Sequence, residues 1–304
     1  MPVVGFGTGA DPPVDHETAV DAVLDAIRTG YCHFDTAPVY NSEKPLGEAI
    51  KKAVDLGLIR SRSEVFVGSK LWCGDSHGEL VLPAIRRTLE NLGMNYIDLY
   101  LIHWPMSSKP GKSGFPIDKH DFLPLNIPSV WAAMEGCFKI GLTKAIGVSN
   151  FSTKKLRQIL AVASIPPAVN QVEVNPCWQQ KKLIDFCKRN SIAVVAYAPL
   201  GASGTFYGSN RVIENQVLQK ISKSKGKSVA QLALRWCYEQ GIGFVAKSFD
   251  KKRMKENTEI FDWSLTSEES DAINNGIPQH RLCPGPDFDS SVNGPFPADG
   301  RLWD

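Results

Sequence analysis

An acidic and a phenolic side chain stand five residues apart in the segment GYCHFDTAPVYNSEKPLG, residues 30–47. Residues 32–34 predict a short strand that runs into Asp35, and Pro38 predicts a loop before Tyr40. A phenol with a pKa near ~10 is a poor proton donor at neutral pH unless a cation lies beside it. The segment therefore directs attention to lysines that the fold could bring to Tyr40.

Two further side chains at the ends of predicted strands complete this chemistry, namely Lys70 and His103. We expect Lys70 to lower the pKa of Tyr40, and Asp35 to hold Lys70 charged and in place. His103 could donate a hydrogen bond to a substrate oxygen and orient it. Such a set protonates a carbonyl oxygen while hydride arrives from elsewhere. Because no side chain supplies hydride, a nicotinamide cofactor is implied.

A strand pattern followed by a helix pattern recurs about eight times, which predicts a (β/α)8 TIM barrel. The strands are expected near 2–6, 32–34, 65–70, 96–102, 143–148, 168–172, 192–197 and 242–246. Long loops are expected after strands 4 and 7, at 106–127 and 201–211, and a tail at 277–304 is expected over the active site. A doubly wound sheet is the alternative. It is disfavoured because no G-x-G-x-x-G opens a helix after the first strand. No linker divides residues 1–304, so one domain is expected.

Other polar and aromatic side chains also follow predicted strands, and in a barrel the active site lies at these strand ends. Ser149, Asn150 and Gln171 suit a carboxamide, which has two donors and one acceptor to satisfy. Tyr197 offers an aromatic face on which a nicotinamide ring could stack. Lys247 and Ser248 follow the last strand.

Each of these residues also has a simpler interpretation. Asp35 and Lys70 could form a structural ion pair, Tyr197 could belong to the core, and Lys247 and Arg253 could be surface cations. The joint arrangement of so many polar groups at one rim is what favours a functional site.

The composition excludes several classes of protein. The 34 Lys and Arg nearly balance the 32 Asp and Glu, which gives no reason to expect nucleic acid or an acidic membrane surface. The seven cysteines contain no CxxC pair, which suggests reduced thiols in a reducing compartment. The six histidines show no ligand spacing, so no metal is expected. No signal-like N-terminus and no apolar run of about 18 residues is present, so a cytoplasmic protein is expected.

The chain resembles the aldo-keto reductases over nearly its whole length, in GYCHFDTAPVYNSE, SKLW, DLYLIHWP, AIGVSNF, VNQVEVNP, AYAPLG and AKSFDKKRMKEN. NPCWQQKKL and ENTEIFDWSLT are most similar to the plant branch of that family. The resemblance implies a usually monomeric barrel enzyme in which Tyr40 is the proton donor and Asp35, Lys70 and His103 complete a catalytic tetrad.

The same resemblance implies NADPH as the cofactor. Ser149, Asn150 and Gln171 would hold its carboxamide and Tyr197 would stack on the nicotinamide. Lys247 and Arg253 would meet the 2′-phosphate, which needs cationic partners. The remaining cofactor-binding positions that it implies are Gly7, Thr8, Asp35, Leu200, Ser248, Phe249, Glu256 and Asn257.

The substrate pocket is expected to be an apolar cleft. Gly9 stands where the family usually carries a tryptophan, and the loss of that indole should widen the pocket for a bulky ketone. The other expected lining residues are Val39, Trp72, Trp104, Phe115, Phe122 and Phe206, with Tyr207 and the tail near Cys283 able to close over a substrate.

These features lead to the hypothesis of an NADPH-dependent carbonyl reductase of plant specialised metabolism, acting on a ketone, aldehyde or imine-like carbon. A broad aldehyde-detoxifying reductase is the alternative of the same class. A nucleotide-binding regulatory subunit without turnover is the alternative of another class, and the intact tetrad argues against it. The sequence does not indicate the substrate, the direction of the reaction or its stereochemistry.

Overall fold

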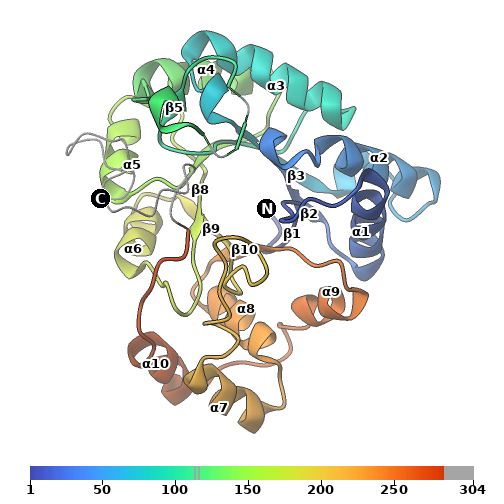
Figure 1. The fold of residues 1–304 in the computed structure, drawn as a ribbon, viewed down its shortest axis with the longest axis vertical. Coiled ribbons are helices and arrows are strands. Elements are labelled where there is room, and N and C mark those ends of the chain that lie inside the picture. The colour runs from blue at the N-terminus through green and yellow to red at the C-terminus, as the bar shows by residue number, and fades with distance from the viewer. Residues whose placement is uncertain (113, 116, 284–304) are drawn as a thin grey trace.

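Eight parallel strands close into a barrel, and helices surround it (Figure 1). The computed structural model describes residues 1–112, 114–115 and 117–283. The barrel strands are β1 (Val4–Gly7), β2 (His33–Asp35), β3 (Phe66–Leu71), β4 (Leu99–Ile102), β7 (Ile146–Ser149), β8 (Val169–Glu173), β9 (Ala193–Tyr197) and β10 (Gly243–Ala246). Their order around the barrel follows the chain, and β1 pairs with β10 to close it. The expected (β/α)8 architecture is therefore confirmed.

The helices follow the apolar periodicity of the sequence. They are α1 (His16–Thr29), α2 (Glu43–Asp55), α3 (Gly78–Leu92), α4 (Ile127–Lys139), α5 (Thr153–Leu160), α6 (Lys181–Arg189), α7 (Gln216–Lys225), α8 (Val229–Glu239), α9 (Lys251–Thr258) and α10 (Ser267–Gly276). In α1 the buried side chains of Val20, Val23, Leu24 and Ile27 recur at the spacing of one helix face. None of the described helices is both long and apolar enough to cross a membrane.

The register of the strands gathers their carboxyl ends at one rim. Gly7 pairs with Asp35, Leu71 with Ile102, and Ser149 with Gln171. Leu99, Leu101, Val169, Val195 and Val245 form one buried cluster of strand side chains, and a larger core lies between strands and helices. A packed barrel with aligned strand ends presents the residues that follow each strand to a common space.

The long loop after β4 contains a feature that the sequence did not predict. Within 106–127, β5 (Ser107–Ser108) and β6 (Phe122–Leu123) form a two-stranded antiparallel sheet. Strands of two residues are too short to show an alternating pattern. Two strands begin later than expected from the sequence: β4 begins at Leu99 instead of residue 96, and β7 begins at Ile146 instead of residue 143. Only an isolated bridge between Ile97 and Thr143 remains of these earlier segments.

Candidate active site

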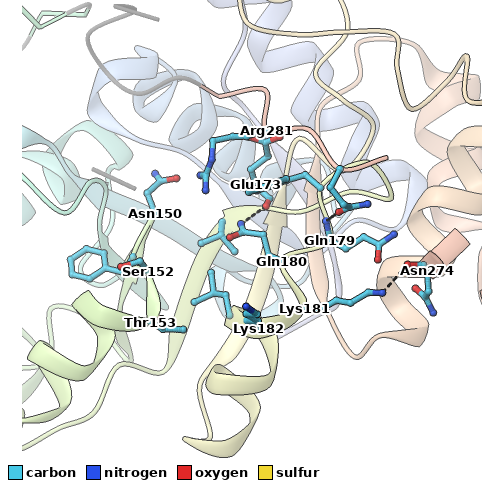
Figure 2. Close-up of a pocket in the computed structure, with 15 residues that line it drawn as sticks. Asn150, Ser152, Thr153, Glu173, Gln179, Gln180, Lys181, Lys182, Asn274 and Arg281 are labelled. Atoms are coloured by element: carbon cyan, nitrogen blue, oxygen red, sulfur yellow. Dashed lines mark hydrogen bonds between the residues drawn. The ribbon is translucent and has the colours of Figure 1, made fainter. Parts of the chain in front are cut away.

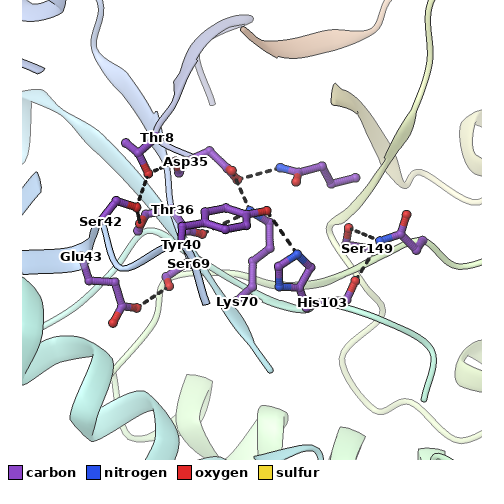
Figure 3. Close-up of polar contacts among 12 residues, drawn as sticks. Thr8, Asp35, Thr36, Tyr40, Ser42, Glu43, Ser69, Lys70, His103 and Ser149 are labelled. Atoms are coloured by element: carbon purple, nitrogen blue, oxygen red, sulfur yellow. Dashed lines mark hydrogen bonds and ion pairs between the residues drawn. The ribbon is translucent and has the colours of Figure 1, made fainter. Parts of the chain in front are cut away.

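Asp35, Tyr40, Lys70 and His103, called the tetrad below, come together at the carboxyl rim (Figure 3). The Lys70 Nζ lies 2.6 Å from Asp35 Oδ2, 3.1 Å from the Thr36 carbonyl oxygen and 3.5 Å from the Tyr40 hydroxyl. The Tyr40 hydroxyl lies 3.2 Å from His103 Nε2. The expected grouping of a phenol, an ammonium, a carboxylate and an imidazole is thus present.

The ion pair within the tetrad is buried and its carboxylate is fully bonded. Asp35 ends β2, and its second oxygen accepts a hydrogen bond of 2.7 Å from Gln171 Nε2. Lys70 is completely buried on β3. Burial lowers the pKa of Lys70, and the neighbouring Asp35 carboxylate opposes that change. The three ammonium hydrogens each have an acceptor, which fixes Lys70 in one position.

The pKa of Tyr40 moves in the direction opposite to the one expected from the sequence. Burial and then the Asp35 charge raise it well above its usual value near 10. The expectation that Lys70 gives this phenol a lowered pKa is therefore wrong in its net direction. The physical reason is that desolvation penalises the phenolate more than the one nearby ammonium favours it. Tyr40 consequently keeps its proton throughout the neutral range.

His103 is a neutral imidazole. Burial, followed by the positive charge of Lys70, lowers the pKa of His103 well below 6.5. Its Nδ1 has no hydrogen-bond partner among the described residues. We therefore assign the proton to Nε2, since a buried N–H without an acceptor is rarer than an unpaired acceptor. His103 Nε2 and Lys70 Nζ then both donate toward the Tyr40 oxygen, and the proton of Tyr40 is free for another acceptor.

The residues expected to hold a carboxamide lie beside the tetrad. Asn150 has a positive φ of 65° and donates through Nδ2 to the His103 carbonyl oxygen at 3.0 Å and to Ser149 Oγ at 3.2 Å. The Tyr197 hydroxyl donates to Asn150 Oδ1 at 2.8 Å. Together with the Gln171 bond to Asp35, these contacts join five strand ends, those of β2, β4, β7, β8 and β9, into one polar network. The structure brings all four residues to the place where the sequence predicted them.

The segment from β10 into α9 carries two cations, Lys247 and Arg253, called the cation pair below. The Arg253 side chain is 70% exposed, and Asp250 lies 4.0 Å from its Nε. Lys247 Nζ lies 5.5 Å from the centre of the Phe249 ring. Burial lowers the pKa of Lys247, Asp11 opposes this, and the positive charge of Arg253 lowers it further. Two cations that repel each other at an open surface form a site suited to a multiply charged anion.

The other expected cofactor-binding residues are spread along this side of the rim. Gly7 ends β1 and lies close to the end of β10. A Cβ added at Gly7 would be 3.9 Å from the backbone nitrogen of Lys247. Leu200 follows β9 and packs against the main core. Ser248 is buried, Glu256 is half-buried, and Asn257 is buried on α9. Thr8 directs its hydroxyl into the protein, to the Asp35 carbonyl oxygen at 3.0 Å.

An apolar cluster, called the aromatic cluster below, adjoins the tetrad. The ring centre of Trp72 lies 5.2 Å from that of His103 and 6.0 Å from that of Phe115. The ring centres of Phe115 and Phe206 are 5.8 Å apart. The same cluster contains Trp104, Val39 and Phe122. A Cβ at Gly9 would lie 3.4 Å from the Tyr40 ring. The expected pocket residues therefore pack against one another or against the tetrad, and their role in binding a substrate stays a prediction.

Sequence reasoning missed part of this cluster. Cys73, Met106 and Ile117 belong to it, and Tyr207 and Cys283, named only as residues that could close over a substrate, also pack in it. Met106 and Ile117 lie in a loop whose sequence has no periodicity, so no pattern could have indicated them. Two backbone N–H groups of the tail, from residues 282 and 283, are held by Glu173 at 2.9–3.2 Å. The rest of the expected tail, 284–304, lies outside the described residues.

A cavity of about 570 Å³ opens next to Asn150 (Figure 2). It lies between the end of β8 and the starts of α5 and α6, and no member of the tetrad lines it. Asn150 is at one edge and Arg281, 4.7 Å over the Trp178 ring, is at another. No group of three or more His, Cys, Asp or Glu is placed to hold a metal in the described part of the chain.

Comparison with known proteins agrees with this geometry. The model of the Aldo/keto reductase family matches residues 3–277. The chain is 54% identical to "7-acetyl-epi-neemfruitin B aldo-keto reductase" of Melia azedarach, over all of this chain and 93% of that protein. It is 54% identical to "NAD(P)H-dependent 6'-deoxychalcone synthase" of Glycine max, over 94% of this chain and 90% of that one.

Two further comparisons cover the whole barrel. The chain is 53% identical to "Deoxymugineic acid synthase 1" of Oryza sativa subsp. japonica, over all of this chain and 95% of that protein. The crystal structure of an aldo-keto reductase from Bombyx mori in complex with NADP superposes with a TM-score of 0.83 at 36% identity, covering 93% of this chain and 91% of that one. With a family model that matches most of its length and these plant relatives, this chain belongs to the aldo/keto reductase family of oxidoreductases.

Proposed function

We propose that this protein is an NADPH-dependent carbonyl reductase in which Tyr40 is the proton donor. The observation that carries the proposal is the hydrogen count at the Tyr40 hydroxyl. Lys70 Nζ and His103 Nε2 both point toward its oxygen, at 3.5 and 3.2 Å, so its own proton is left for a substrate oxygen. The raised pKa of Tyr40 keeps that proton in place until a stronger base forms.

The reaction then divides between the residues as follows. A bound nicotinamide supplies hydride to the carbonyl carbon. The single N–H of His103, on Nε2, points to the Tyr40 oxygen, and a bound substrate would share it, which would orient the carbonyl oxygen beside Tyr40. As the oxygen becomes an alkoxide, Tyr40 transfers its proton to it, and the phenolate that remains is stabilised by the Lys70 ammonium. Asp35 keeps Lys70 charged, and solvent returns a proton to Tyr40.

NADPH is the cofactor that the donor set fits best. The cation pair has no carboxylate within 3.9 Å of either charged group among the described residues, so a 2′-phosphate would relieve its repulsion. The Bombyx mori relative holds NADP in its crystal structure, and the soybean relative is named for NAD(P)H. Ser149, Asn150 and Gln171 would hold the carboxamide, and Tyr197 would stack on the nicotinamide.

The aromatic cluster supports a bulky, largely apolar carbonyl substrate of plant specialised metabolism. Its rings come from the loops after β3, β4 and β9, and at Gly9 no side chain lies over the Tyr40 ring, where a Cβ would be 3.4 Å away. Steady-state kinetics with small aldehydes and bulky cyclic ketones test this. Similar efficiency on both would instead support a broad aldehyde-detoxifying reductase.

The organisation of the protein is part of the proposal. We propose that residues 1–304 form one domain that works as a cytoplasmic monomer. Six of the seven cysteines are buried, which suits reduced thiols in a reducing compartment. Sedimentation at micromolar concentration tests the monomer.

The Tyr40→Phe variant tests the proton-donor role. The ring and its packing remain while the proton is lost, so turnover should fall by about 10²–10⁴-fold. NADPH binding, followed by quenching of tryptophan fluorescence, should be unchanged. Turnover that persists would contradict the assignment of Tyr40. A wild-type protein that binds NADPH but reduces no carbonyl compound would instead support a regulatory subunit.

A further inference from the structure

Three hydroxyl groups form a chain beside the tetrad, from Thr36 through Ser42 to Thr8 (Figure 3). Thr36 Oγ1 lies 2.8 Å from Ser42 Oγ, and Ser42 Oγ lies 2.7 Å from Thr8 Oγ1. Thr8 Oγ1 in turn donates to the Asp35 carbonyl oxygen at 3.0 Å. The side chains come from three separate places in the sequence, namely the end of β1, the end of β2 and the start of α2.

Counting hydrogens fixes the direction of this chain. Each hydroxyl has one hydrogen to donate, and Thr8 gives its hydrogen to Asp35. Ser42 must therefore donate to Thr8, and Thr36 must donate to Ser42. Hydrogen bonds that run in one direction polarise one another in a buried environment. The chain is thus a one-way relay of hydroxyls that ends on the backbone of Asp35.

The relay closes into a ring through the tetrad itself. The Thr36 carbonyl oxygen accepts from Lys70 Nζ at 3.1 Å, and Lys70 Nζ also donates to the Asp35 carboxylate. The residues at the two ends of the relay are therefore joined to the ion pair through backbone carbonyl oxygens, those of Asp35 and Thr36. The 3₁₀ turn from Pro38 to Tyr40 lies between Thr36 and Ser42, so these two residues hold the turn at its two ends.

Ser42 gives up a common local role to take part in this ring. It occupies the N-cap position of α2, where a serine side chain ordinarily accepts a hydrogen bond from the helix backbone. No such bond is formed, and the buried Ser42 hydroxyl turns to Thr8 and Thr36 instead. A helix cap that is left unmade indicates that the hydroxyl stabilises the tertiary arrangement around Tyr40 and not α2.

We propose that Ser42 is a positioning residue for the reaction, which acts by holding the Pro38–Tyr40 turn so that the Tyr40 hydroxyl meets Lys70 and His103. This proposal rests on the proposed function, since it gives Ser42 its effect through the proton donor. A misplacement of about 1 Å at a reacting group costs about 10²-fold in rate. The hydroxyl of Ser42 therefore bears on kcat through the position of Tyr40.

Two variants remove the relay in different ways. Ser42→Ala deletes its middle hydroxyl, and Thr36→Val deletes its first donor while it keeps the shape of the side chain. For both we expect kcat to fall by about 10–10²-fold, with NADPH affinity unchanged. Thr143→Val is the matched control, because Thr143 is equally buried and bonds the Ala145 carbonyl oxygen far from the rim. It should lower the melting temperature without lowering kcat.

The decisive readout is a double-mutant comparison with Tyr40→Phe. If Ser42 acts through Tyr40, then Ser42→Ala should have no further effect on the residual turnover of Tyr40→Phe. A loss of the same factor in both backgrounds would overturn the proposal, as would a kcat of Ser42→Ala and Thr36→Val equal to that of the wild type. The proposed function fails on a different result, namely full turnover by Tyr40→Phe alone.

Discussion

The tetrad and the cation pair present two kinds of electrostatic site in one barrel. In the tetrad, Lys70 is completely buried and each of its hydrogens has an acceptor in the protein. In the cation pair, Arg253 is largely exposed, and among the described residues its nearest carboxylate, that of Asp250, is 4.0 Å away. A charge that is buried and bonded on all sides can be set precisely, whereas an exposed charge is available to a ligand. Reaction chemistry and cofactor choice therefore depend on different electrostatic environments in this molecule.

Removing the buried charge should have the largest effect. Lys70→Met leaves Asp35 buried with only the Gln171 amide as side-chain partner. Breaking a buried pair in this way costs about 3–5 kcal/mol of the free energy of unfolding. Turnover should also fall by about 10²–10⁴-fold, because the phenolate of Tyr40 loses its cation. Urea unfolding and steady-state kinetics measure the two losses.

The double variant Lys70→Met, Asp35→Asn is the control for that experiment. It removes the uncompensated charge, so much of the unfolding free energy should return while turnover stays low. Recovery of turnover in the double variant would mean that the ion pair stabilises the fold and takes no part in the reaction.

The exposed charge should have a smaller and more selective effect. Arg253→Ala should weaken the binding of NADPH by about 10–10²-fold, since one charge-assisted contact is lost, and leave the binding of NADH nearly unchanged. Lys252→Ala is the matched control, because Lys252 is an exposed neighbour on the same helix. Equal weakening of both cofactors in Arg253→Ala would contradict a 2′-phosphate role.

The pH dependence of reduction should distinguish the members of the tetrad. The pKa of Lys70 lies below 10.5 and that of Tyr40 lies well above 10, so reduction should decline at alkaline pH as Lys70 loses its charge first. The pKa of His103 lies well below 6.5, so no loss from this residue is expected near that pH. A profile of kcat/KM from pH 5 to 10 measures both limits. A loss of kcat/KM near pH 6.5 that occurs in the wild type and disappears in His103→Asn would mean that His103 titrates there. That result would contradict the neutral imidazole.

The smallest effect should come from a buried histidine outside the tetrad. Burial lowers the pKa of His33, whose Nδ1 lies 2.9 Å from the Pro2 carbonyl oxygen. The folded protein therefore binds this proton less readily than the unfolded chain does. The stability that His33 contributes is complete above pH 6.5, its unfolded value, and is lost as the pH falls below it. Urea midpoints at pH 7.5 and 5 should differ less in His33→Gln than in the wild type. The exposed His120→Gln should behave as the wild type does.

The sequence predicted the tetrad because side-chain chemistry and strand ends are local properties. Asp35, Lys70 and His103 each follow an apolar strand, and parallel strands in a barrel end at one rim. The direction of the Tyr40 pKa was not predictable in this way. It depends on how deeply neighbouring elements bury the phenol, and no pattern in residues 30–47 records that depth.

Other parts of the site depend on contacts between distant segments. Ser42 has the sequence signature of a helix cap, and its actual partner Thr8 lies 34 residues earlier. Ile117 packs in the aromatic cluster although it lies in a loop without periodicity. The strands β5 and β6 are each two residues long, which is too short for a sequence pattern. Such features follow from tertiary packing, which overrides local preference.

The hydrogen bond between Gln171 and Asp35 links residues that are 136 positions apart and lie on β8 and β2. A contact of such long range closes a large loop, and the entropy of that closure must be offset by the rest of the barrel. The first strand also pairs with the last, Val4 opposite Phe244. The bonded Asp35 carboxylate therefore requires strands from opposite sides of the barrel to be in place together. Turnover in this protein therefore depends on barrel closure, since the carboxylate that holds Lys70 is bonded from the opposite side of the barrel.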